Sequence, residues 1–107
     1  MAEDSRLILS TFPDADTARR IARILVEEKL AACVNLVPQI ESIYRWKGAI
    51  ETASEVLALI KSTIGKYQML ENRIRELHPY EVPEIVCLHI ETGSLDYLRW
   101  IEQSVLE

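Results

Sequence analysis

The chain has 107 residues, of which 49% are hydrophobic and 27% are charged. This length and composition predict one ordered globular domain over residues 1–107 and argue against a second domain or a long disordered linker. The formal net charge of −5 disfavours a protein that binds nucleic acid or a membrane surface through phosphate groups. The acidic start, Met1 to Asp4, does not resemble a signal peptide, and no apolar run approaches the roughly 20 residues of a membrane span. We therefore expect a cytoplasmic protein.

Apolar residues recur along the chain with either the two-residue period of strands or the period of helices. In chain order they predict a strand over 6–12, a helix from Asp14 or Asp16 to about Lys29, strands over 32–46 and 50–60, a helix from Thr63 or Gly65 to His78, a strand over 85–90 and a short helix near 97–105. This β-α-β-β-α-β order, followed by a helix, predicts an α+β ferredoxin-like sandwich with an antiparallel sheet and helices on one face.

The two middle strands form a long hairpin that turns at Gly48. A strand from Ala32 to Trp46 would span about 50 Å at ~3.3 Å per residue. A domain of this size is only roughly 26 Å across. We therefore expect the hairpin to bend, with Pro38 as the predicted position, or to project from the domain.

Four segments stand out, Thr11–Asp14, Leu30–Asn35, Ser42–Gly48 and His78–Glu84, and the second and fourth of them are long and unusual sequences. Together they resemble the CutA family of divalent-cation-tolerance proteins, and the resemblance runs from about Leu7 to Val105. It implies a homotrimer assembled through intermolecular sheet, similar in shape to PII signalling proteins. It also implies a role in tolerance of copper and other divalent cations. The family has no agreed enzymatic activity, so we expect a protein that is not an enzyme.

Copper is the cofactor that the resemblance implies, and His78 is the position to which it carries a metal role. Some bacterial members look to have Cys where this chain has Ser10 and His where it has Leu77, so neither position carries that role here. Glu84, and Cys33 from another strand, are further candidate ligands. The alternative for His78 is structural, with an imidazolium at the helix end that bonds the last free carbonyl groups. For Cys33, apolar neighbours favour packing of an inert thiol.

Four further residues predict a cleft. Tyr44 and Trp46 lie two residues apart on one face of a strand, where they can stack a ligand or anchor a subunit interface, and the length of the hairpin favours the interface. Lys61, at the end of an apolar strand, is predicted to pair with a carboxylate such as Glu84, with anion binding as the alternative. In a trimer these residues and Tyr80 would line clefts between subunits.

Two functions remain open from the sequence. The first is a trimeric metal-responsive or regulatory binding protein, and the second is a structural scaffold that presents its trimer to a protein partner and binds metal incidentally. An RNA-binding domain shares the element order, but the acidic balance and the single phenylalanine, Phe12, oppose it. An acylphosphatase-like enzyme shares the fold as well, but the chain has no phosphate-cradling glycine-rich loop.

Overall fold

Strands and helices follow the predicted order in the computed structural model, which describes residues 4–106. The elements are β1 (Ser5–Phe12), α1 (Ala15–Glu27), β2 (Cys33–Trp46), β3 (Ala49–Thr63), α2 (Ile64–Leu77), β4 (Ile85–His89) and α3 (Leu95–Ser104). This order confirms the α+β fold class. Met1, Ala2 and Glu3, which entered the prediction of a cytoplasmic location, lie outside the described residues.

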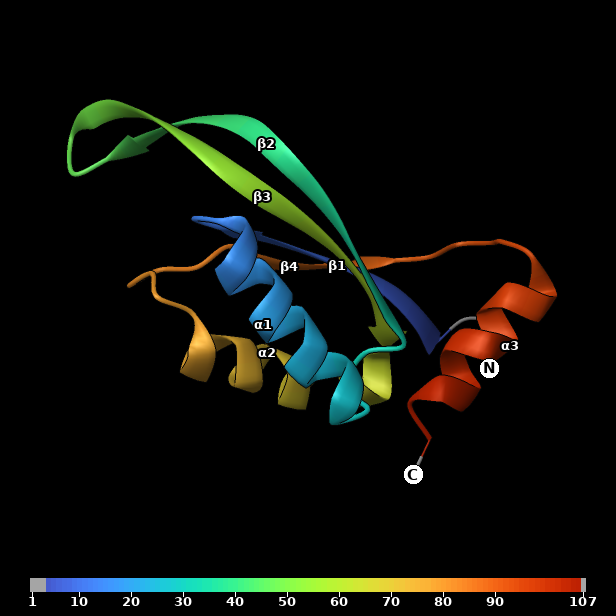
Figure 1. Cartoon of the computed structure of the whole chain (residues 1–107). Coiled ribbons are helices and arrows are strands. Elements are labelled where there is room, and N and C mark those ends of the chain that lie inside the picture. Colours follow the sequence, from blue (N-terminus) through green and yellow to red (C-terminus); the bar gives the residue numbers. More distant parts are fainter. Residues whose placement is uncertain (1–3, 107) are drawn as a thin grey trace.

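The four strands form one sheet in the order β2-β3-β1-β4, and every neighbouring pair is antiparallel. Helices α1 and α2 lie side by side against one face of this sheet, whereas α3 lies at its far end and contacts β3 and β1 (Figure 1). The predicted arrangement with helices on one face is therefore confirmed for α1 and α2, and the last helix packs against Ala32, Cys33 and Ile90 at the end of the sheet.

The core lies between the sheet and the α1–α2 layer. On the sheet side, Ile8 pairs with Ile60 and Phe12 pairs with Val56, and all four side chains are at most 5% exposed. Helix α1 begins where predicted, because the Asp14 carboxylate accepts a hydrogen bond from the backbone N–H of Thr17 at 2.7 Å. Burial of these apolar side chains orients both helices.

The opposite face of the sheet is largely apolar and is not covered by α1 or α2 (Figure 1); of the described helices only α3 contacts it, at one end. Cross-strand partners share a face, so the register places Leu9 beside Leu59 and Val86 on that side. Leu88 joins them from β4 and is 46% exposed, and Val86 is 44% exposed. We call this surface, formed by Leu7, Leu9, Leu57, Leu59, Val86 and Leu88, the open sheet face.

The β2–β3 hairpin both bends and projects, as its length required. Its register shifts between Val37 and Ile40, and Gln39 has a φ of 60°, so the bend lies at the predicted Pro38. The tip turns through Lys47 and Gly48, both with positive φ. The hairpin extends past the helices in Figure 1, and the longest dimension of the molecule is 44 Å.

Candidate functional site

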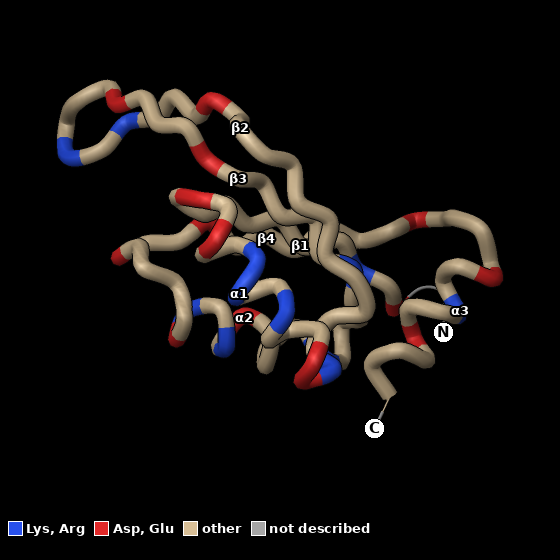
Figure 2. Tube along the Cα trace, viewed as in Figure 1, with Lys and Arg blue, Asp and Glu red and all other residues tan. Residues whose placement is uncertain are grey.

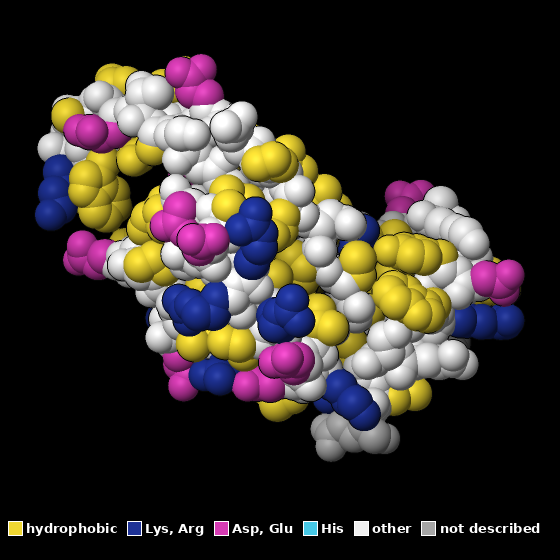
Figure 3. Space-filling view, in the orientation of Figure 1, with side chains coloured by type: hydrophobic (Ala, Val, Ile, Leu, Met, Phe, Trp, Pro, Cys, Tyr) yellow, Lys and Arg dark blue, Asp and Glu magenta, His cyan; other side chains and the backbone are white. Residues whose placement is uncertain are grey.

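A groove of about 720 Å³ lies between the projecting hairpin and the loop that follows α2. The hairpin contributes Tyr44 and Trp46, and the loop contributes Tyr80 and Glu84, so the groove brings together four of the residues predicted from sequence. Its remaining lining is Thr11, Ser42, Ile43, Glu55, Glu81, Val82 and Pro83. Hydrophobic and acidic side chains meet under the hairpin tip in Figure 3.

The groove is acidic. Glu55, Glu81 and Glu84 line it, and no Lys or Arg is found among its described lining residues. Acidic residues from the hairpin, from the start of α1 and from the loop after α2 come close together at this end of the molecule (Figure 2). Such a concentration of negative charge favours cationic ligands over anionic ones.

Glu55 is the buried member of this group and was not predicted. Its side chain is 7% exposed, and its Oε2 accepts a hydrogen bond from the Tyr80 hydroxyl at 2.6 Å. Burial, followed by this contact with Glu55, raises the pKa of Tyr80, so the phenol stays a donor. A glutamate directly before Val56, inside a strand that becomes apolar, was the sequence signal that could have identified it.

His78 stands behind the groove and is 8% exposed. Its Nε2 lies 2.7 Å from the Thr11 carbonyl oxygen, which can only accept, so Nε2 carries the proton and donates. The backbone N–H of Tyr80 donates to Nδ1 at 3.1 Å. The ring also stacks on Phe12 with centroids 4.8 Å apart. Burial lowers the pKa of His78, and the neutral ring fits both hydrogen bonds.

These contacts bear on both sequence interpretations of His78. Its ring bonds a carbonyl of β1, so the predicted imidazolium cap of α2 is wrong, and the helix end is instead capped by the His78 backbone N–H, which donates to the Ile74 carbonyl at 2.8 Å. Both ring nitrogens are already bonded, which leaves neither of them free to bind a metal.

The three predicted metal ligands do not converge within one subunit. Cys33 pairs with Lys61, which in turn pairs with Leu7, whereas His78 bonds Thr11, four residues further along β1. That spacing corresponds to about 13 Å. Within residues 4–106, no group of three or more His, Cys, Asp and Glu side chains is placed to hold a metal ion. A single subunit therefore does not fit copper with these ligands.

Lys61 lies away from the groove, so its predicted ion pair with Glu84 is wrong. Its Nζ donates a hydrogen bond to Asn35 Oδ1 and lies 5.9 Å from the centroid of the Tyr97 ring. Cys33 Sγ lies 3.7 Å from the same Asn35 oxygen. The alternation of β3 places Lys61 on the open sheet face, where only neighbouring strands and α3 supply partners.

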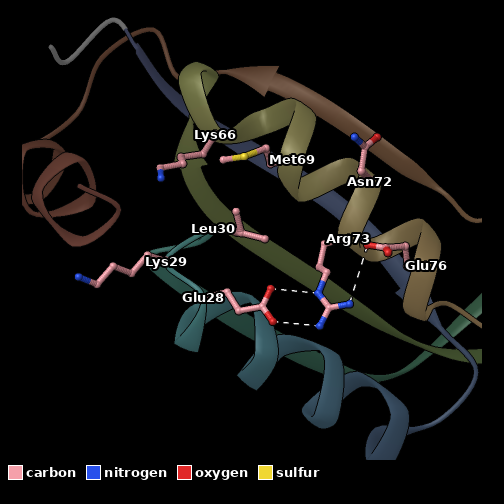
Figure 4. A pocket seen from close by; sticks show the side chains of 8 residues that line it. All are labelled: Glu28, Lys29, Leu30, Lys66, Met69, Asn72, Arg73 and Glu76. Atoms are coloured by element: carbon pink, nitrogen blue, oxygen red, sulfur yellow. Dashed lines mark hydrogen bonds and ion pairs between the residues drawn. The ribbon is translucent and has the colours of Figure 1, made fainter. Parts of the chain in front are cut away.

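A second hollow, of about 620 Å³, lies between the end of α1 and the side of α2 (Figure 4). Arg73 occupies its wall and forms two hydrogen bonds with the Glu28 carboxylate, at 2.9 and 3.0 Å. The same guanidinium lies 3.8 Å from Glu76. These charges satisfy one another, and none of the residues predicted from sequence lines this hollow.

Comparisons with known proteins agree on one family. The model of the CutA1 divalent ion tolerance protein family matches residues 6–104. A divalent-cation tolerance protein CutA of Thermus thermophilus is 48% identical over 98 residues, which are 92% of this chain and 95% of that protein. Protein CutA of Homo sapiens is 50% identical over 93 residues, 87% of this chain, and the match spans only 52% of the human protein.

Solved structures of proteins named CutA or CutA1 share this fold. One, described as the periplasmic divalent cation tolerance protein CutA of Archaeoglobus fulgidus, has a TM-score of 0.92 and 37% identity, and the match covers 95% of this chain and 99% of that one. Among the described residues, no helix is both long and apolar enough to cross a lipid bilayer.

Proposed function

Because the chain belongs to the CutA1 divalent ion tolerance family, we propose that it is a homotrimeric binding protein that takes a small cationic ligand in its groove. The observation that carries this proposal is the composition of the groove, with three glutamates, three aromatic rings and no described cationic lining residue. The ligand class is a divalent metal such as copper or a small regulatory molecule. The role is binding rather than catalysis, and the location is the cytoplasm.

The open sheet face supports the trimer. Exposed Val86 and Leu88 continue an apolar surface that an isolated subunit would present to water. Strands β2 and β4 are also at the sheet edges, where their unpaired backbone groups can extend a sheet into another subunit. A closed assembly covers both features at once.

A divalent metal would require ligands from two subunits. Glu81 and Glu84 are exposed on the loop at the groove rim, and Cys33 lies elsewhere on the sheet. A trimer places the rim of one subunit beside the surface of the next, so carboxylates that do not converge in one chain can do so across the interface.

The test is calorimetric titration of metal-free protein with CuCl₂ and, separately, ZnCl₂. We expect saturable binding with one site per subunit, weakened at least tenfold in Glu84→Gln and unchanged in the matched surface variant Glu76→Gln, because Glu76 lies on α2 outside the groove. Binding that Glu84→Gln does not alter would contradict the groove as the site.

The scaffold remains a second candidate because of α3. Tyr97 and Trp100 stack with centroids 5.6 Å apart and are 42% and 44% exposed, and Leu95 beside them is 52% exposed. Exposed aromatic residues of this kind are typical of protein interfaces. A stable trimer that binds no cation in the groove would favour the scaffold.

A further inference from the structure

The carboxylates of the groove are spread along it rather than gathered at one point. Glu55 belongs to β3 and is buried, whereas Glu81 and Glu84 belong to the loop after α2 and are exposed. In the described part of the chain these groups do not form a cluster that could hold one metal ion. Separated negative charges are matched by a ligand whose positive charges are also separated.

The wall between the carboxylates is apolar and aromatic. Tyr44 and Trp46 come from the hairpin, Tyr80 comes from the loop, and Ile43 and Val82 add aliphatic surface. Aromatic faces attract ammonium groups, and aliphatic surface accommodates methylene chains. Lys47 already lies with its Nζ 5.7 Å from the Trp46 ring centroid, so this ring can interact with an ammonium group.

Glu55 provides the strongest single contact for such a ligand. Tyr80 binds only its Oε2, and within residues 4–106 no cation neutralises the carboxylate. A buried carboxylate without a counter-ion gains substantially from a charged hydrogen-bond donor. The Tyr80 hydrogen bond fixes the direction of the carboxylate, so the site is organised before a ligand arrives.

We propose that the ligand of the groove is an aliphatic organic polycation, a diamine or oligoamine in its protonated form. One ammonium group binds Glu55 at the aromatic wall, the methylene stem lies against Ile43 and Val82, and the second ammonium group binds the rim carboxylate Glu84. This inference rests on the proposed function, because it assigns a chemical class to the cationic ligand of the same groove. The groove volume of about 720 Å³ is that of a small-molecule site.

The test is calorimetric titration of the metal-free assembled protein with 1,4-diaminobutane dihydrochloride at constant ionic strength. The neutral analogue 1,4-butanediol has a similar length and shape without the charges. We expect saturable binding of the diamine with one site per subunit and no measurable binding of the diol. Equal binding of the two compounds would overturn the proposal.

Two variants locate the site. Glu55→Gln keeps an acceptor for the Tyr80 hydroxyl but removes the charge. Glu84→Gln removes a charge from the exposed rim, where the substitution does not endanger folding. Each should weaken diamine binding at least tenfold, whereas Glu76→Gln on α2 should leave it unchanged. Circular dichroism and sedimentation of each variant establish that fold and assembly persist.

The outcomes separate this inference from the proposed function. Diamine binding that survives Glu84→Gln with wild-type affinity would overturn the inference. Divalent metal binding that depends on Glu84, together with a flat diamine titration, would overturn the inference alone. No saturable binding of either cation class would overturn both.

Discussion

The ring of His78 shows how a single residue couples folding to pH. The Thr11 carbonyl requires a proton on Nε2, and the Tyr80 N–H requires a lone pair on Nδ1. A second proton on the ring would break the bond to Tyr80 and place a charge in a buried site. The native state therefore resists protonation, as the lowered pKa of His78 indicates.

This coupling predicts a pH dependence with a definite sign. Because the folded-state pKa lies below the unfolded value of about 6.5, the unfolded chain binds the proton first as pH falls. We expect the free energy of unfolding to be constant above that pH and to decrease below it until the folded-state pKa is passed. Urea unfolding of the wild type, at fixed protein concentration between pH 8 and 5, measures it.

The matched variants are His78→Gln and His89→Gln. His78→Gln should lower the free energy of unfolding by about 1 to 3 kcal/mol at pH 8, because the Thr11 carbonyl and the Tyr80 N–H lose well-aligned hydrogen-bond partners. It should also flatten the decrease in that free energy below about pH 6.5. The second, on an exposed histidine of β4, should retain that decrease. A decrease that persists in His78→Gln would assign it to other groups.

Two buried serines make a second prediction at the residue scale. Ser10 and Ser62 are both 0% exposed, but Ser62 Oγ donates to the Leu30 carbonyl at 2.6 Å, whereas Ser10 Oγ has no hydrogen-bond partner among the described residues. Ser10→Ala should therefore raise the free energy of unfolding by about 1 kcal/mol, and Ser62→Ala should lower it by a similar amount. Chemical denaturation compares them, and loss of stability in Ser10→Ala would contradict the assignment.

At the scale of elements, the β2–β3 hairpin is divided by its bend. Before Pro38, Val34 and Leu36 of β2 pack against the core, whereas Ile43 and Ile50 near the tip are 68% and 63% exposed. Apolar side chains at a projecting tip contribute little to the core of their own subunit. Their exposure therefore indicates that the tip packs against another surface.

The tip therefore predicts a separation of assembly from folding. Trp46→Ala should make the trimer dissociate at a higher protein concentration while the circular dichroism of the subunit changes little, because Trp46 is the last residue of β2 at the hairpin tip and is 40% exposed. Met69→Ala on α2, where the side chain is 50% exposed, serves as the control and should leave assembly unchanged. Dilution series by sedimentation velocity distinguish the two, and equal behaviour would remove Trp46 from the interface.

At the scale of the whole molecule, helices α1 and α2 cover one face of the sheet, whereas the other face carries only α3 at one end in the part of the chain that the structure describes. Antiparallel sheets tolerate a solvated face when that face is polar, but here it carries Leu9, Leu59, Val86 and Leu88. The exposed apolar area and the two free edges point to the same solution, a closed assembly of subunits.

A charge on the open sheet face should prevent that assembly. Leu88→Glu places a carboxylate at a position that is 46% exposed in the subunit, so it should shift the sedimenting species from trimer to monomer without unfolding the chain. Val26→Glu on α1, at 42% exposure, is the matched control and should remain a trimer. A wild-type protein that is monomeric at low micromolar concentration would contradict the trimer itself.

The amino-acid sequence by itself determined the order and type of the elements, narrowed the cap of α1 to Asp14 or Asp16, and marked Pro38 as the position where the long hairpin could bend. It also singled out Tyr44, Trp46, Tyr80 and Glu84, although it placed them in clefts between subunits, whereas they line one groove of a single subunit. These features follow from local periodicity, backbone restrictions and a family resemblance. Only the tertiary structure decided the neutral state of His78, the partners of Lys61 and the burial of Glu55. His78 and its acceptor Thr11 are 67 residues apart, and Glu55 and Tyr80 are 25 residues apart, so their contacts depend on strand register and on the path of the loop after α2. Hydrogen-bond partners set by register are not encoded in any local pattern, because a shift of one residue would turn each side chain to the other face of the sheet.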